Sequence, residues 1–182
     1  NTEVKINSNG EYVWNTTLRG GSNEGMGSIT IDYNNNVYIS GVFNGCCPSY
    51  MNATLHSSNG SSYTLYAEGY ANGFAAKLDS EGSPLWGING WGRDLGMGAL
   101  YIYEDELYIT GGFRTWGSGD SGTITSTDGN QYSLYNPGIG LSFLAKYDTE
   151  GIHQWNTSIG NAGNGVNATT SISDVITTES GD

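Results

Sequence analysis

The chain has 182 residues, and 18 acidic side chains against 6 basic ones give it a formal net charge of −12. A surface this acidic repels nucleic-acid phosphates and anionic lipids, so we expect no nucleic acid as a partner and no membrane insertion. Aromatic residues make up 12% of the chain, which supplies enough apolar surface for one folded domain over 1–182. The chain opens on Asn1 without a signal peptide, which indicates a processed form or a fragment.

The first predicted element is a β-hairpin over residues 2–17, TEVKINSNGEYVWNTT. A glycine, Gly10, stands where a bulged turn needs a left-handed residue. The same pattern returns as FAAKLDSEGSPLWGI at 74–88 and as FLAKYDTEGIHQWNT at 143–157. Trp14, Trp86 and Trp155 hold one position in these three copies.

Two other kinds of hairpin alternate with this one along the chain. GMGSITIDYNNNVYISGVF at 25–43 matches GMGALYIYEDELYITGGF at 96–113, and both alternate apolar and polar residues around a turn. Residues 54–65 and 123–134 form the third kind, with Asn59-Gly60 and Asp128-Gly129 at tips that favour positive φ. No segment has a convincing helical period. We therefore expect an all-β protein built of antiparallel hairpins.

The three kinds of hairpin recur with a period of about 70 residues, and the chain holds about 2.6 copies of the unit. Two hairpins form the constant part of each copy, and the third is an insertion. The stretches NNNVYISG, EDELYITG, FAAKLDSEGSPLW and FLAKYDTEGIHQW resemble the SBBP-type β-propeller repeat of secreted bacterial and archaeal proteins. This resemblance implies that each copy is one blade, in a mostly non-catalytic, secreted or surface-anchored scaffold.

On this interpretation the fold is β-propeller-like, with an incomplete blade at each terminus. Residues 1–20 are the second half of a blade, 21–92 and 93–163 are repeat copies, and 164–182 begin a further blade. Each half-blade leaves an unpaired strand edge. The chain would then be a piece of a longer propeller, close a ring with copies of itself, or join other copies head to tail.

No residues are expected to be catalytic. Gly-Asp-Ser-Gly surrounds Ser121, and His56, Asp94 and Ser121 follow the chain order of a trypsin-like triad. However, position 56 falls in a polar hairpin and Ser121 in a variable loop, so a protease is disfavoured. The carboxylates fall at equivalent turns, where Asp caps the turn backbone. They offer at most a loose Ca²⁺ site, and we expect no other cofactor.

The repeat tryptophans are expected in the core between blades, and the equivalent Lys77 and Lys146 along a strand with their ammonium groups at its edge. Trp91 and Trp116 depart from the repeat, so loop packing and a stacking platform for sugars are both open for them. Cys46 and Cys47 are adjacent; they could form a strained ring disulfide, reach another chain or be two small loop residues.

Five sequons mark candidate glycosylation sites for an exported chain: Asn15, Asn52, Asn59, Asn156 and Asn167. The sequence thus favours an acidic, extracellular or cell-surface glycoprotein, not an enzyme, that self-assembles into a homo-oligomer or homopolymer, as a ring or a filament. The alternative is a carbohydrate- or ligand-binding module of a larger surface adhesin, with glycans as partners, which would use Trp91, Trp116 and tyrosines such as Tyr70.

Overall fold

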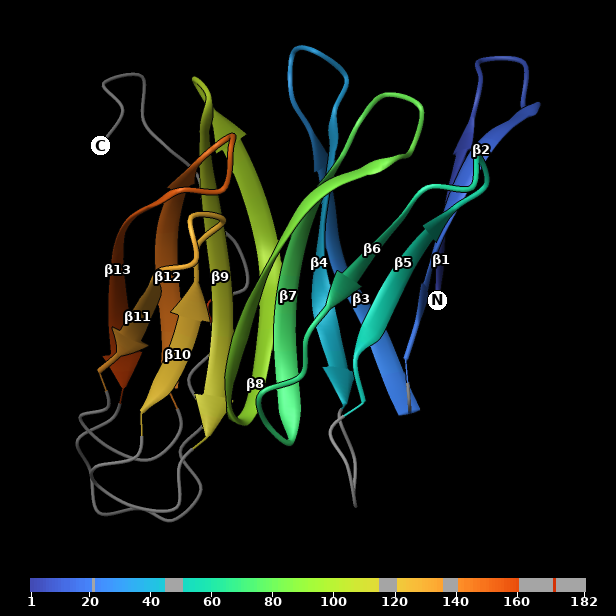
Figure 1. Ribbon diagram of the computed structural model, residues 1–182. Helices are drawn as coiled ribbons and strands as arrows, with labels where there is room; N and C mark the ends of the chain where they lie inside the picture. The colour runs from blue at the N-terminus through green and yellow to red at the C-terminus, as the bar shows by residue number, and fades with distance from the viewer. Residues whose placement is uncertain (21, 45–50, 115–120, 136–140, 161–171, 173–182) are drawn as a thin grey trace.

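The computed structural model describes residues 1–20, 22–44, 51–114, 121–135, 141–160 and 172, and every regular element in them is a β-strand (Figure 1). All strand pairs are antiparallel. The strands are β1 (Thr2–Ile6), β2 (Tyr12–Arg19), β3 (Ser22–Ile31), β4 (Val37–Asn44), β5 (Ala53–Ser57), β6 (Ser62–Leu65), β7 (Ala71–Leu78), β8 (Pro84–Tyr103), β9 (Glu106–Arg114), β10 (Gly122–Thr125), β11 (Gln131–Leu134), β12 (Leu141–Asp148) and β13 (His153–Gly160).

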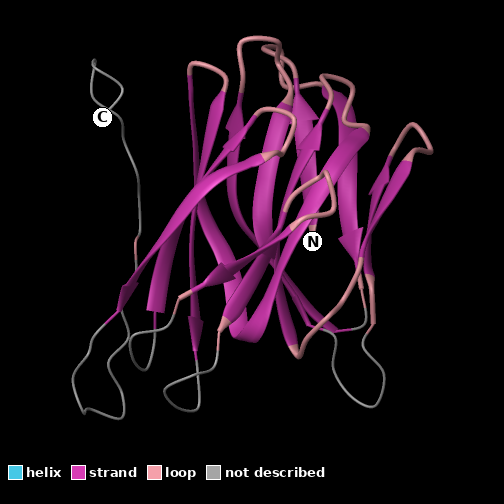
Figure 2. Cartoon of the chain, turned by 60° about the vertical axis from the view of Figure 1, so that its left-hand side comes forward, coloured by secondary structure: helices cyan, strands magenta, loops and turns pink. Residues whose placement is uncertain are grey.

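The strands form three sheets that pack one against the next (Figures 1 and 2). Sheet 1 has the order β1-β2-β5-β6. Sheet 2 contains β3, β4, β7, residues 84–92 of β8, and the β10–β11 hairpin. Sheet 3 contains residues 93–103 of β8, then β9, β12 and β13. The fold class is therefore confirmed as all-β and propeller-like, and the described residues do not close a ring.

Strand β8 was expected as two separate strands, but it is continuous over 20 residues. Its first half pairs with β7 as far as Gly92, and its second half pairs with β9 from Arg93 onward. Asp94 takes a positive φ of 51° at this change of partner. One extended segment therefore serves as a strand of two neighbouring sheets.

The inserted hairpins pair with the sheet that precedes them in the chain. In the chain, β5 lies between β4 and β7, which both belong to sheet 2. It nevertheless pairs with β2 of sheet 1. In the chain, β10 lies between β9 and β12, which both belong to sheet 3. It nevertheless pairs with β8 in sheet 2, where Ile124 lies opposite Gly90. Sheets 1 and 2 are thus each extended by residues from the next repeat.

Sheet 2 is covered on both faces, because successive side chains of a strand point to opposite sides. Every residue of β7 is buried. Phe74 and Ala76 belong to the core shared with sheet 1, whereas Ala75 belongs to the core shared with sheet 3. The blades therefore stack face to face, with an apolar layer on each side of the central one.

Candidate functional site

The most specific contact between sheets 1 and 2 joins a lysine and a tryptophan to a single carbonyl group. Lys5 Nζ and Trp14 Nε1 donate to the Ser80 carbonyl oxygen at 3.0 and 2.9 Å. Thr16 Oγ1 adds a hydrogen bond of 2.7 Å to the Gly82 carbonyl oxygen in the same turn. We call the lysine–tryptophan pair and the turn that it contacts the Lys-Trp latch.

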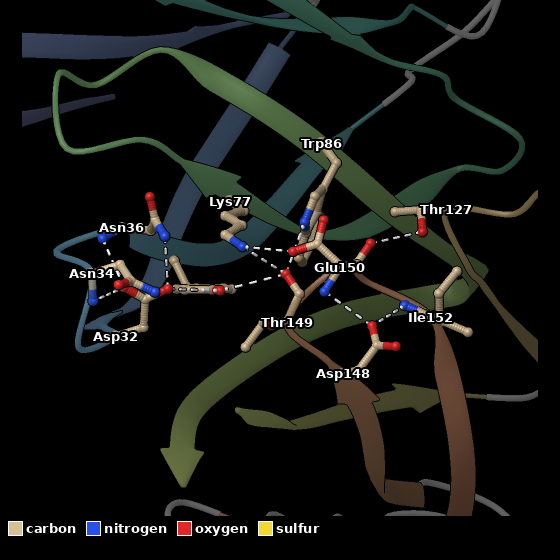
Figure 3. A network of polar contacts seen from close by, with 11 residues as sticks. Asp32, Asn34, Asn36, Lys77, Trp86, Thr127, Asp148, Thr149, Glu150 and Ile152 are labelled. Atoms are coloured by element: carbon tan, nitrogen blue, oxygen red, sulfur yellow. Dashed lines mark hydrogen bonds and ion pairs between the residues drawn. The ribbon is translucent and has the colours of Figure 1, made fainter. Parts of the chain in front are cut away.

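The same contact recurs between sheets 2 and 3, with every member moved by one repeat (Figure 3). Lys77 Nζ and Trp86 Nε1 donate to the Thr149 carbonyl oxygen at 2.9 and 3.2 Å. Lys77 also forms an ion pair of 3.1 Å with Glu150, whose side chain is 75% exposed. The sequence placed the Lys77 ammonium at a strand edge, and this was wrong: Lys77 is only 6% exposed. The turn of the next blade covers it and supplies its acceptors.

The turns that accept these bonds have the same internal geometry. In the 79–82 turn, Asp79 Oδ1 accepts the backbone N–H groups of Glu81 and Ser83 at 2.9 and 2.8 Å. Asp148 Oδ1 caps the 148–151 turn in the same way. These acidic residues therefore fix the direction of the carbonyl that follows them, which is the acceptor of the latch.

A buried polar network supports the second latch. Tyr38 lies edge-on to Trp86, with ring centroids 5.9 Å apart, and donates its hydroxyl to Asp32 Oδ2 at 3.2 Å. Burial together with the nearby charge of Asp32 raises the pKa of Tyr38, which keeps its hydroxyl protonated. Burial alone would raise the pKa of Asp32, but hydrogen bonds from Asn36, Asn34 and Tyr38 outweigh it and lower that pKa. The result is a fixed carboxylate against a neutral phenol.

A third lysine–tryptophan pair lies on the outer face of sheet 3. The sequence predicted all three repeat tryptophans in the core between blades, and for Trp155 this was wrong: Trp155 is 41% exposed, against 5% for Trp14 and 7% for Trp86. Its indole ring still contacts Tyr108, at 6.4 Å between centroids, as Trp86 contacts Tyr38. Lys146 turns to Glu106, 3.3 Å away. In the described part of the chain, no turn covers this pair and no acceptor meets the Trp155 N–H.

An apolar groove lies at the opposite end, between β1 and β3. It has a volume of about 310 Å³, and its lining includes Trp14, Ile29 and Ile31. The equivalent space between sheets 2 and 3 holds Tyr38, which packs with Trp86 and Leu100. The groove thus has the place that the aromatic side chain of Tyr38 fills in sheet 2, where β4 pairs with β7.

The predicted glycosylation sites are spread over two sheets. Asn52 and Asn59 are exposed, and the Nδ2 of Asn59 contacts Ser83 Oγ at 2.6 Å. Asn15 and Asn156 are half-buried, and Asn156 Nδ2 lies 3.1 Å from His153 Nε2. Asn167 lies outside the described residues. Glycosylation itself stays a prediction at all five positions.

The tryptophan and cysteine candidates differ in whether the structure describes them. Trp91 is half-buried inside sheet 2, opposite Asn72 of β7 and Thr123 of β10. Trp116, Cys46 and Cys47 lie outside the described residues.

His56 and Asp94, two of the residues in trypsin-like order, lie in different sheets. His56 lies in sheet 1, paired with Thr17 and Ser62. Asp94 lies 3.8 Å from both Arg93 and Arg114 at the bend of β8. No hydrogen bond or ion pair joins His56 to Asp94 where the chain is described, and no three His, Cys, Asp or Glu side chains there gather as a metal site would need. Among the same residues, no helix is long and apolar enough to span a membrane.

Sequence reasoning missed the latch because its acceptors are backbone atoms. The visible signal was the spacing from the repeat lysine and tryptophan to the next D-x-E-G turn, with Lys5 and Lys77 lying 75 and 72 residues before their acceptors, Ser80 and Thr149. The spacing alone names neither the atoms nor the contact.

The comparisons with known proteins agree with a propeller-type repeat. The chain is 28% identical, over 122 residues, to a protein of Acanthamoeba polyphaga mimivirus described as "Uncharacterized WD repeat-containing protein L264". The match covers 62% of this chain and 8% of that protein. WD repeats form β-propeller blades. No protein-family profile matches the chain.

Proposed function

We propose that this chain is a non-catalytic structural repeat module of an extracellular or cell-surface protein, and that it self-assembles blade to blade into a ring or a filament. The observation that carries the proposal is the repetition of the Lys-Trp latch, which joins each described sheet to the next. A protein built in this way extends by adding sheets, and its two end faces remain able to bind further ones. The resemblance to the SBBP-type repeat supports a secreted setting. This repeat is a more narrowly defined class than propeller repeats in general.

The mass and shape of the native particle test this proposal. Light scattering combined with electron microscopy of the same sample should give a multiple of the chain mass and a regular ring or fibre. A particle of one chain mass over the whole concentration range would contradict self-assembly. The intact mass of the exported protein tests glycosylation separately, since a bare polypeptide mass would remove that part of the proposal.

The carbohydrate-binding alternative rests on one surface feature. Tyr70 is 54% exposed and lines a hollow of about 530 Å³ with Arg93 and Asp94. An aromatic ring beside charged hydrogen-bonding groups suits the face of a sugar ring. A glycan array would favour this alternative if saturable binding disappears in Tyr70→Ala and in Trp116→Ala, and would exclude it if no glycan binds.

A further inference from the structure

The described residues contain one more donor pair and one more acceptor turn than the two latches use. The donor pairs are Lys5/Trp14, Lys77/Trp86 and Lys146/Trp155, and the first two contact the turns at 79–82 and 148–151. In the third pair Trp155 is exposed on sheet 3, whereas Lys146 is half-buried and pairs with Glu106. The third turn, residues 7–10, remains exposed on sheet 1.

The exposed turn is built like the two that serve as acceptors. Asn7 Oδ1 accepts the backbone N–H groups of Asn9 and Glu11 at 2.9 and 3.0 Å, in the manner of Asp79 and Asp148. Gly10 has a φ of 81°, against 79° for both Gly82 and Gly151. The carbonyl of Ser8 therefore stands where the carbonyls of Ser80 and Thr149 stand in the other two turns.

The glycine of each occupied turn lies directly against a tryptophan ring. A Cβ atom on Gly82 would come within 2.6 Å of Trp14, and one on Gly151 within 3.3 Å of Trp86. A Cβ on Gly10 would meet nothing within 4 Å. Gly10 thus presents an open surface of the shape that receives an indole ring.

From the unused Lys146/Trp155 pair and the unused 7–10 turn we infer that two copies of this chain associate head to tail. Lys146 and Trp155 of one copy donate to the Ser8 carbonyl of the next, and the 7–10 turn of the next copy covers the Trp155 ring. Exposed apolar side chains at both ends fit burial on association, since Val4 is 56% and Val13 43% exposed in sheet 1 and Trp155 is 41% exposed in sheet 3. The inference rests on the proposed self-assembly and names its joint.

Each of two substitutions blocks one side of the joint. Trp155→Ala removes the donor and the ring but leaves the 7–10 turn. Gly10→Asn fills the surface that receives the ring, and Asn tolerates the left-handed backbone of that position. Tyr66→Ala and Gly129→Asn are the matched controls, because Tyr66 is 62% exposed and Gly129 has a φ of 85° with nothing within 4 Å of an added Cβ. Circular dichroism and urea midpoints confirm that each variant is folded, and Lys146→Gln provides a second donor variant.

Sedimentation velocity over a concentration series measures the association. Each blocking variant should weaken self-association by at least about 10-fold, as loss of a central interface tryptophan does, and the controls should behave as wild type. A mixture of Trp155→Ala and Gly10→Asn should form one-to-one pairs and nothing longer, since only one intact donor and one intact turn remain. Assembly that persists unchanged in both variants would overturn this joint and leave the proposed function standing. A wild-type chain that never associates would overturn both.

Discussion

The imidazole ring of His153 in β13 stacks on the phenol ring of Tyr132 in β11, with centroids 3.7 Å apart and planes 18° from parallel. Tyr132 belongs to the hairpin that extends sheet 2, and His153 belongs to sheet 3. Tyr147 meets the same imidazole edge-on at 5.4 Å. This aromatic contact therefore joins two blades through a histidine, the side chain whose ordinary pKa lies closest to neutral pH.

The stability of the fold should fall as the pH decreases through about 6.5, the ordinary His value. Burial lowers the pKa of His153, and the charge of Asp128 only partly opposes this. The folded state then binds fewer protons than the unfolded state in this range. The stabilisation that neutral His153 provides is therefore complete above the pKa of His153 in the unfolded state, and it is lost as the pH falls toward its pKa in the folded state. Urea midpoints at pH 7.5 and pH 5.5 measure the loss. His153→Gln should reduce it, and an unchanged pH dependence in that variant would contradict this role.

Lys77→Met should lower the free energy of unfolding by about 1–3 kcal/mol, because it keeps the stem but removes charged hydrogen bonds to Thr149 and Glu150. Lys5→Met is the matched comparison, since Lys5 makes the same kind of bond, to Ser80, from a half-buried position. We expect a smaller loss there. Equal losses in urea unfolding would mean that burial does not set the strength of the latch.

The three repeat tryptophans provide an internal scale for blade packing. Trp86→Ala should cost about 3–5 kcal/mol, the range for a buried large aromatic residue, and Trp14→Ala should behave similarly. Trp155→Ala should cost less than half as much, because 41% of Trp155 is exposed. Chemical unfolding of dilute, monomeric samples measures all three. A Trp155→Ala loss as large as that of Trp86→Ala would show that exposure is a poor guide here.

Gly82→Ala should destabilise the protein more than Gly129→Ala. Both glycines have positive φ, 79° and 85°, so both variants lose about 1–2 kcal/mol through the left-handed backbone. Only the new Cβ at position 82 meets another group, the Trp14 ring at 2.6 Å, which adds about 1–3 kcal/mol of overpacking. Thermal unfolding of the two variants isolates this second cost as a difference. Equal melting temperatures would mean that the Trp14 ring moves away freely.

Local pattern was enough to find most of the turns and strands. Gly10, Gly82 and Gly151 have the positive φ that their turns require, and the tips at Gly60 and Gly129 do as well. Trp14 and Trp86 lie in the core, as the repeat predicted. These features depend on a few neighbouring residues, which is why spacing and turn chemistry could identify them.

Long-range partners were beyond the reach of the sequence. Alternation shows that 54–65 is a hairpin, but it does not say that Leu55 faces Leu18 in the preceding sheet. It also cannot say that residues 84–103 stay extended through a change of sheet, because the glycines near Gly92 are equally typical of a turn. Lys77 was misplaced for a related reason: its acceptor is a carbonyl 72 residues away.

The backward pairing of the inserted hairpins sets an order for synthesis on the ribosome. Residues of β2 emerge first, but the β5 strand that covers their edge follows only after all of β3 and β4. The edge of β8 in sheet 2 waits in the same way for β10, which follows β9. A nascent chain therefore exposes an unfinished edge until about half of the following repeat has been translated, so a sheet is completed only after synthesis of the next repeat is well under way.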